Sequence, residues 1–210
     1  VVILTSVLFL FLLIWQTFSA SSIHKSYQES LMDSITDQIL FDYQEYFNQL
    51  RLEIDLFQKI HNHAIERINQ LGAQTSESDY MPVLDALKSE INYSRFFALV
   101  GREGEASLSH ITGNFLPACE EEVLSTIKQG IQKQLFLHHS TSSVHFDLLQ
   151  PLITQNNQGE YFFVSFNTDV IKTLLVKYQL PHQQLFLMRS DNIGKIELTS
   201  EDSNDKYEKM

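Results

Sequence analysis

The chain has 210 residues, with 15 basic and 26 acidic side chains, a formal net charge of −11 and a single cysteine. This acidic balance argues against a nucleic-acid partner, because nucleic acids select basic surfaces. One cysteine excludes an intrachain disulfide. A domain of this size outside the cytoplasm without disulfides is more typical of bacteria than of secreted eukaryotic proteins.

The first 23 residues contain no charged side chain and begin with the run VVILTSVLFLFLLIWQTFSA. About 20 apolar residues at 1.5 Å each match a hydrocarbon core of roughly 30 Å. Trp15 and Phe18 lie near the end of this run, where aromatic rings favour the headgroup level. We therefore expect residues 1–23 to be a transmembrane anchor, with a cleaved secretory signal or a buried core helix as alternatives. Since the chain starts at Val1 rather than Met, further residues are expected upstream.

Residues 24–72 contain no proline, and their only glycine is Gly72, so they predict one long helix that stands partly as a stalk. Apolar positions recur at alternating spacings of four and three, a heptad pattern typical of coiled coils. We interpret part of this pattern as a dimer seam, and packing on the chain's own sheet is the alternative. The predicted seam residues are Tyr43, Phe47, Leu50 and Ile54.

Residues 73–200 predict a separate domain of short strands and helices. A short helix is expected over 81–91, with Asp79 as its N-cap. The expected strands are 93–100, 105–111, 134–139, 143–153, 160–167, 184–189 and 195–199, and the later helices are 117–130 and 170–178. Short hairpins favour antiparallel pairing, so the predicted fold class is α+β, an antiparallel sheet with flanking helices. Residues 201–210 are a charged tail, where we expect the domain to be truncated.

The order of these elements resembles the extracytoplasmic Cache-type (PAS-like) sensor domains of bacterial transmembrane receptors. The hairpin that opens such a sheet is similar to YSRFFALVGREGEASLSH, and the later strands and helix are similar to YFFVSFNTDVIKTLLVKYQLP and QQLFLMRSDNIGKIELTS. The resemblance covers most of residues 20–200. It implies ligand sensing, dimerisation through the long helices, and a cytoplasmic output domain such as a diguanylate cyclase.

A sensor pocket needs an apolar wall with a few convergent polar groups. Alternation along the strands over 93–100 and 160–167 predicts such a wall on one sheet face. A buried Arg95 would require an anion, and a ligand carboxylate could supply it. The candidate ligand-binding residues are Tyr93, Arg95, Phe97, Asp147, Tyr161, Phe163 and Ser165.

Histidines and an aspartate crowd one predicted strand–turn–strand segment, where His139, His145 and Asp147 are weak candidates for a zinc site. The alternative is that they are exposed strand and loop residues. Motifs for nucleophilic catalysis, phosphate loops and GGDEF are absent from the sequence, so we expect neither catalysis nor a cofactor in this chain.

Together these patterns predict a homodimeric extracytoplasmic sensor domain, anchored in a bacterial inner membrane and binding an unknown small molecule. The long helix would pass the signal to an output domain outside this sequence. Two alternatives remain: a singly anchored adaptor that uses its long helix as a coiled coil, and an exported hydrolase. A continuation into a second apolar run and a cytoplasmic domain would favour the sensor.

Overall fold

The computed structural model describes residues 2–101, 123, 127, 136–139, 144–153, 160–188 and 196–200. The predicted strand over 105–111, nearly all of the predicted helix over 117–130 and the charged tail lie outside the described residues. The chain divides into two compact units, Val1–Gln44 and Glu45–Met210. Their boundary falls inside the predicted stalk helix.

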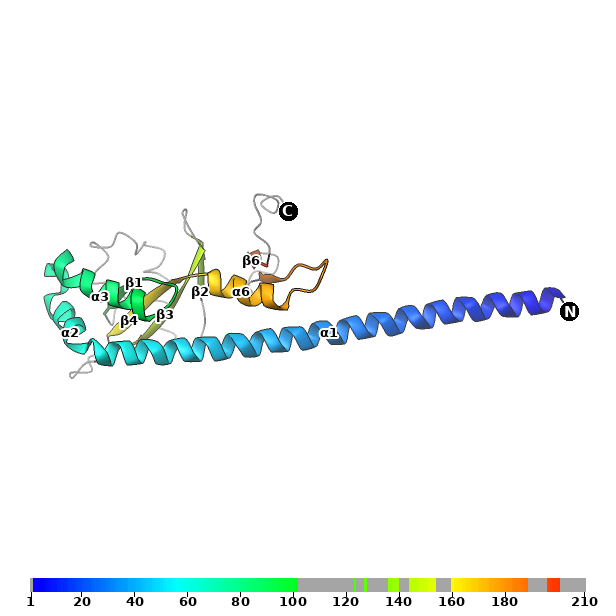
Figure 1. Ribbon diagram of the computed structural model, residues 1–210, viewed down its shortest axis with the longest axis horizontal. Helices are drawn as coiled ribbons and strands as arrows, with labels where there is room; N and C mark the ends of the chain where they lie inside the picture. Colours follow the sequence, from blue (N-terminus) through cyan, green and yellow to red (C-terminus); the bar gives the residue numbers. More distant parts are fainter. Residues whose placement is uncertain are drawn as a thin grey trace. The chain divides into compact units, whose positions relative to one another are not determined.

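Helix α1 runs from Val2 to Ile60, so the predicted anchor and most of the predicted stalk belong to one element (Figure 1). Residues with good helix propensity and the absence of proline and glycine explain its length. The helix ends at Ile60, and α2 (Asn62–Leu71) begins after His61, so two helices replace the single helix predicted over 24–72. Gly72 ends α2 with a φ of 50°, as the sequence predicts.

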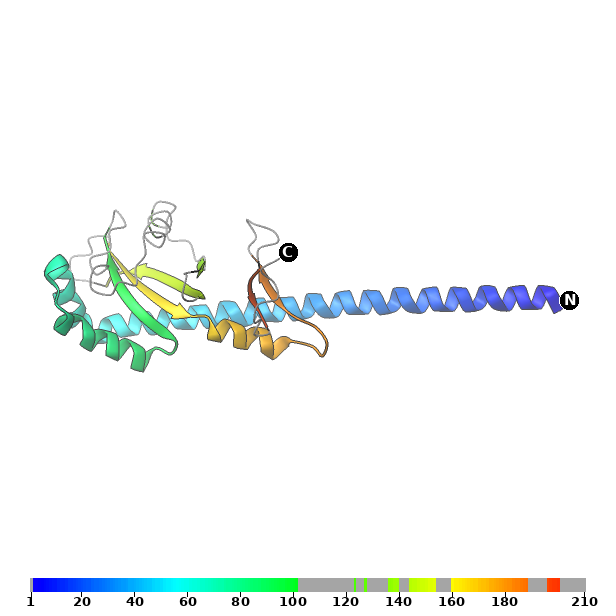
Figure 2. The same ribbon diagram turned by 90° about the horizontal axis from the view of Figure 1, so that it is seen from above.

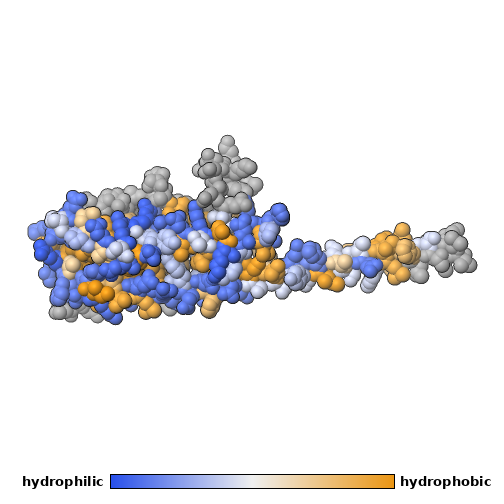
Figure 3. Space-filling view, viewed as in Figure 1, coloured by the Kyte–Doolittle hydropathy of each residue, from blue (hydrophilic) through white to orange (hydrophobic). Residues whose placement is uncertain are grey.

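The first unit, taken by itself, exposes an apolar helix surface. The seven consecutive side chains from Phe9 to Trp15 are all apolar and 44–68 % exposed. Figure 3 shows an apolar region on this part of α1. Apolar side chains on all sides of a helix are unfavourable in water, so this segment favours a lipid or protein neighbour. Among the residues that the structure describes, no helix meets the length and apolarity required to span a bilayer.

The second unit contains a four-stranded antiparallel sheet in the order β1-β4-β3-β2 (Figure 2). Its strands are β1 (Ser94–Val100), β2 (Phe136–His139), β3 (Val144–Pro151) and β4 (Tyr161–Asn167). Helix α6 (Asp169–Tyr178) follows β4 and precedes a two-stranded sheet of β5 (Phe186–Met188) and β6 (Ile196–Thr199). The α+β class with a long N-terminal helix and an antiparallel sheet is confirmed.

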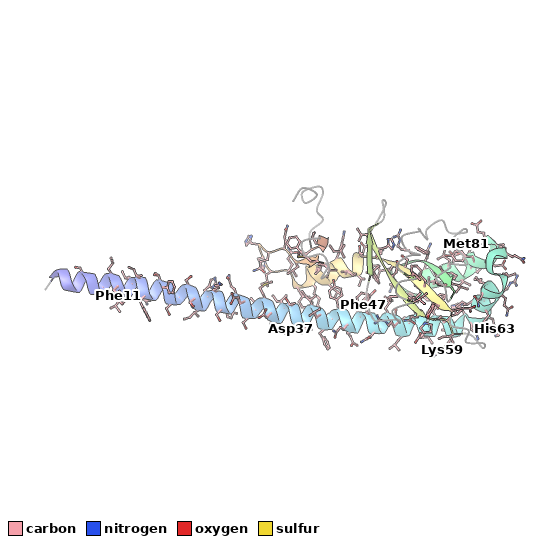
Figure 4. The ribbon with its side chains drawn as sticks, turned by 180° about the vertical axis from the view of Figure 1, so that it is seen from behind. Phe11, Asp37, Phe47, Lys59, His63 and Met81 are labelled. Atoms are coloured by element: carbon pink, nitrogen blue, oxygen red, sulfur yellow. The ribbon has the colours of Figure 1, made fainter. Side chains whose placement is uncertain are left out.

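One face of this sheet packs on the C-terminal part of α1. The register places Phe146 opposite Phe166 and Leu148 opposite Val164, and alternation puts these four side chains on one face. Phe47 of α1 meets the ring of Phe146 with centroids 5.4 Å apart (Figure 4). The core therefore lies between α1 and the central strands.

The position of this core corrects the prediction for most of the dimer-seam residues. Phe47, Leu50 and Ile54 are buried inside their own unit, with 8 %, 2 % and 0 % of their surfaces exposed. The heptad pattern arises because a helix face that packs on a sheet has the same spacing as one that packs on a second helix. Tyr43 is half-buried and belongs to the first unit, and its place in a dimer seam stays a prediction.

Helix α3 (Glu77–Glu90) closes the same side of β1. Its N-cap is Ser76 rather than the predicted Asp79, whose side chain instead accepts the Ser76 N–H at 3.3 Å in a capping box. A 3₁₀ turn, η1 (Gly72–Gln74), connects α2 to this cap. Tyr80 of α3 stacks on Phe97 and donates its hydroxyl hydrogen to the Phe97 carbonyl oxygen at 3.1 Å.

Candidate functional site

The sheet face opposite α1 carries a group of buried polar side chains. His145 and Asp147 alternate along β3 with Phe146 and Leu148, so they point away from the α1 face. The register places Asp147 directly opposite Ser165 of β4. We call His145, Asp147 and Ser165 the polar cluster.

The polar cluster is buried and holds an ionisable pair. His145 Nε2 lies 3.8 Å from Asp147 Oδ2, and the two side chains are 5 % and 6 % exposed. This separation allows electrostatic attraction but is too long for a direct hydrogen bond. The Ser165 hydroxyl is also buried and has no hydrogen-bond partner among the described residues. A buried hydroxyl without a partner costs free energy, which a bound polar group would recover.

An aromatic pair borders the polar cluster on the same face. Phe163 of β4 and Phe96 of β1 have ring centroids 5.8 Å apart, and Phe96 is the register partner of Ser165. Aromatic surface beside a few polar groups is the composition expected of a small-molecule site. On this face an Asp147 carboxylate can accept hydrogen bonds, and the Ser165 hydroxyl can donate or accept them.

Phe96 was not among the predicted site residues, because alternation from Tyr93 selects Arg95 and Phe97, the other set of β1 side chains. Phe97 lies on the α1 and α3 side, where its ring stacks on Phe162 with centroids 5.4 Å apart. A register irregularity between Ser94 and Phe96 interrupts the pairing of β1 with β4. Such an irregularity changes which residues share a face, and it depends on the partner strand rather than on the local pattern. The apolar residues of β1 are consecutive, so hydrophobicity alone did not distinguish its two faces.

The other candidate ligand residues divide between the cluster's sheet face and the start of β1. Tyr161 is half-buried and lies two residues before Phe163, at the far end of the same face of β4. Tyr93 is 44 % exposed and precedes β1 with a φ of 65°, and the half-buried Arg95 falls at the register irregularity. The structure therefore brings together Asp147, Phe163 and Ser165 and leaves Phe97 on the opposite face.

The weak metal candidates occupy different register positions. His139 pairs with Val144, whereas His145 pairs with His138 on β2 and with Asn167 on β4. Within the described ranges, no group of three or more His, Cys, Asp or Glu side chains is placed to hold a metal ion.

No family model matches this chain, and a search of curated proteins also found no match. The resemblance to Cache-type sensor domains therefore stays a prediction from the sequence.

Proposed function

We propose that this chain is the PAS/Cache-like ligand-sensing domain of a membrane-anchored bacterial receptor and that the polar cluster is its ligand site. The observation that carries the proposal is the buried Ser165 hydroxyl, which has no partner among the described residues and lies beside the buried His145–Asp147 pair. Burying a hydroxyl group is unfavourable unless a hydrogen bond satisfies it. A small molecule with a polar group would supply that bond to Ser165, and the Phe96–Phe163 pair would cover its apolar part.

The proposed anchor is residues 1–23. Its support is the absence of charged side chains in this segment and the exposed apolar run from Phe9 to Trp15. Lipid would remove this surface from water at a gain of roughly 25 cal/mol per Å². The rest of the chain would then lie outside a bacterial inner membrane, and the output domain, possibly a diguanylate cyclase, would lie in residues beyond this sequence.

The proposed signal starts in strands β3 and β4, which contact α1 through the face that the polar cluster does not use. Asp147 lies next to Phe146 in β3, and Phe146 contacts Phe47 of α1. A ligand that prefers one position of β3 would therefore shift the population of packing states between the sheet and α1. Helix shifts of about 1–2 Å are sufficient for such a switch.

A hydrolase is less well supported by the same residues. Ser165 is fully buried and is the register partner of Asp147, while the register partner of His145 is Asn167. A nucleophilic serine requires a base within hydrogen-bond reach and an approach for the substrate. The polar cluster therefore fits ligand binding better than acyl transfer.

A thermal-shift screen of the full chain in detergent micelles tests the ligand site. The compounds are small carboxylates, amines and divalent metal salts, and a specific ligand should raise the unfolding midpoint in a concentration-dependent way. Ser165→Ala and Asp147→Asn should each abolish the shift. The matched controls are Ser89→Ala and Asp85→Asn, because Ser89 and Asp85 are exposed on α3. A ligand whose shift survives both cluster substitutions would place the site elsewhere, and the absence of any shift would contradict the proposal.

The anchor is tested separately by alkaline carbonate extraction of membranes from cells that express the full chain. An anchored chain should remain in the membrane pellet. Release of the protein into the supernatant would contradict the anchor without affecting the ligand site.

A further inference from the structure

Rows of side chains cross the sheet face that carries the polar cluster. Strand β4 lies between β1 and β3, so a β4 residue on this face has a register partner on both sides (Figure 2). Ser165 pairs with Asp147 of β3 and with Phe96 of β1. Because Ser165 and Asp147 are buried, this row would meet the polar part of a ligand in surroundings with little water.

The neighbouring row on the same face is apolar. Phe163, two residues before Ser165 on β4, pairs with Leu149 of β3 and with Ala98 of β1. We call Leu149, Phe163 and Ala98 the apolar row. The two rows lie roughly 6.8 Å apart, because two residues of an antiparallel strand span this distance. Leu149 is half-buried, so it is the member of the apolar row with surface left for a ligand to cover.

The buried Ser165 hydroxyl restricts the charge of the ligand's polar head group. This hydroxyl has no hydrogen-bond partner among the described residues, and it can both donate and accept. A carboxylate head would accept from Ser165 but would place a second negative charge beside the Asp147 carboxylate, and like charges repel. An ammonium head can only donate, so the Ser165 hydrogen would remain without an acceptor. A hydroxyl head accepts from Ser165 and donates to Asp147, so it fits both groups.

We infer that the ligand of the polar cluster is an uncharged molecule with a hydroxyl head and a short apolar chain. The head binds between Ser165 and Asp147, and the chain extends along β4 to the apolar row. A chain of about four carbons spans the distance between the rows, since carbon–carbon bonds measure about 1.5 Å. This inference rests on the proposed function, because it names the ligand class of the proposed site.

Three probes of equal chain length test the head group: 1-butanol, butylammonium chloride and sodium butyrate. They extend the ligand screen to alcohols, and the unfolding midpoint of the full chain in detergent micelles is measured with each probe. The wild type is compared with Ser165→Ala, which should fold because the lost hydroxyl has no partner among the described residues. Each probe affects the micelles equally for both chains, so the difference between their midpoint shifts reports binding at Ser165.

1-Butanol should bind the wild type roughly tenfold or more tightly than either charged probe, the factor expected from one unsatisfied or repelled polar group. The matched control Ser89→Ala, at an exposed position of α3, should respond as the wild type does. Tighter Ser165-dependent binding of butyrate or butylammonium would overturn the hydroxyl head and leave the proposed ligand site in place. The absence of a Ser165-dependent shift with every compound of the extended screen would contradict the proposed function as well.

A series of alcohols from ethanol to 1-butanol tests the position of the apolar chain. Each added methylene group should raise the affinity roughly fourfold as the chain extends over the apolar row. Leu149→Ala should reduce this factor, because it removes the half-buried side chain that the ligand would cover. Leu56→Ala, at an exposed position of α1, is the matched control and should leave the factor unchanged. A wild-type affinity that does not increase with chain length, or a factor that Leu149→Ala does not change, would overturn the inference.

Discussion

Gln58 of α1 and Ile153, two residues beyond β3, are joined by a hydrogen bond: the Ile153 N–H donates to Gln58 Oε1 at 3.0 Å. The amide of the same glutamine reaches the carbonyl oxygen of Pro151 at 3.5 Å, and Gln58 is 1 % exposed. A polar residue thus occupies a core position of α1 because it satisfies the backbone where β3 ends. This bond connects the helix that would transmit a signal to the strand that carries Asp147.

Replacing Gln58 should destabilise the second unit. Gln58→Leu retains the side-chain volume but removes the acceptor for the Ile153 N–H, and a buried unsatisfied group costs roughly 1–3 kcal/mol. Urea unfolding followed by circular dichroism measures the loss. Gln49→Leu, at an exposed position of α1, is the control. Equal stability of the two variants would mean that the helix–strand bond contributes nothing.

Shortening Ile54 should be costly because this side chain is fully buried between α1 and the sheet. Ile54→Val should cost about 0.5–1.5 kcal/mol and Ile54→Ala about 2–5 kcal/mol, as cavities of increasing size predict. The unfolding midpoint in urea should not depend on protein concentration for either variant. A loss that appears only at low protein concentration would return Ile54 to a dimer interface.

Alkaline pH should lower the free energy of unfolding of the second unit, because two of its tyrosines are partly buried and resist ionisation. Burial, the Glu53 carboxylate and Tyr93 raise the pKa of Tyr46 to about 12, and burial raises that of Tyr80 above its usual range. A tyrosine with a raised pKa keeps its proton in the folded state while the unfolded chain ionises above about pH 10. Stability should therefore be constant below pH 10 and fall between pH 10 and 12.

Urea unfolding at pH 9, 10 and 11 checks this alkaline loss, and tyrosinate absorbance reports the ionisation. Tyr46→Phe and Tyr80→Phe should each reduce the slope of stability against pH, while Tyr27→Phe, at an exposed position, should leave it unchanged. Stability that rises between pH 10 and 11 would have the wrong sign for buried phenols.

Adding a side chain at Gly72 should destabilise the turn after α2 for conformational reasons alone. Gly72 has a φ of 50°, and a Cβ at this position would meet no atom within 4 Å. Gly72→Ala should therefore cost roughly 1 kcal/mol or more, from backbone strain and not from a clash. Gln74→Ala two residues later is the control, and equal unfolding midpoints for the two variants would contradict the strained backbone.

Local patterns predicted most of the elements that the structure describes. The 93–100 and 160–167 strands appear as β1 and β4, and Gly72 ends a helix as expected. These features depend on residues close in sequence: alternation, caps, and the backbone freedom of glycine. The interruption at His61 was not predicted. One histidine breaks the heptad pattern there, but without a proline or glycine such a break does not by itself indicate the end of a helix.

The candidate site was predicted in part for the same reason. Asp147, Phe163 and Ser165 were named from alternation along single strands, whereas Phe96 depended on how β1 pairs with β4. The register of a strand depends on its partner strand. One register irregularity moves every later side chain of the strand to the opposite face of the sheet.

The amino-acid sequence by itself determined the α+β class, the long N-terminal helix and the apolar character of residues 1–23, because hydrophobic period and backbone propensity act locally. Only the tertiary structure decided that Phe47, Leu50 and Ile54 pack on the sheet and that Leu52, Leu56 and Ile60 remain exposed. Both sets of residues have helical spacing, and this spacing does not determine which surface each face of the helix contacts. That choice follows from where the strands bury the most apolar surface.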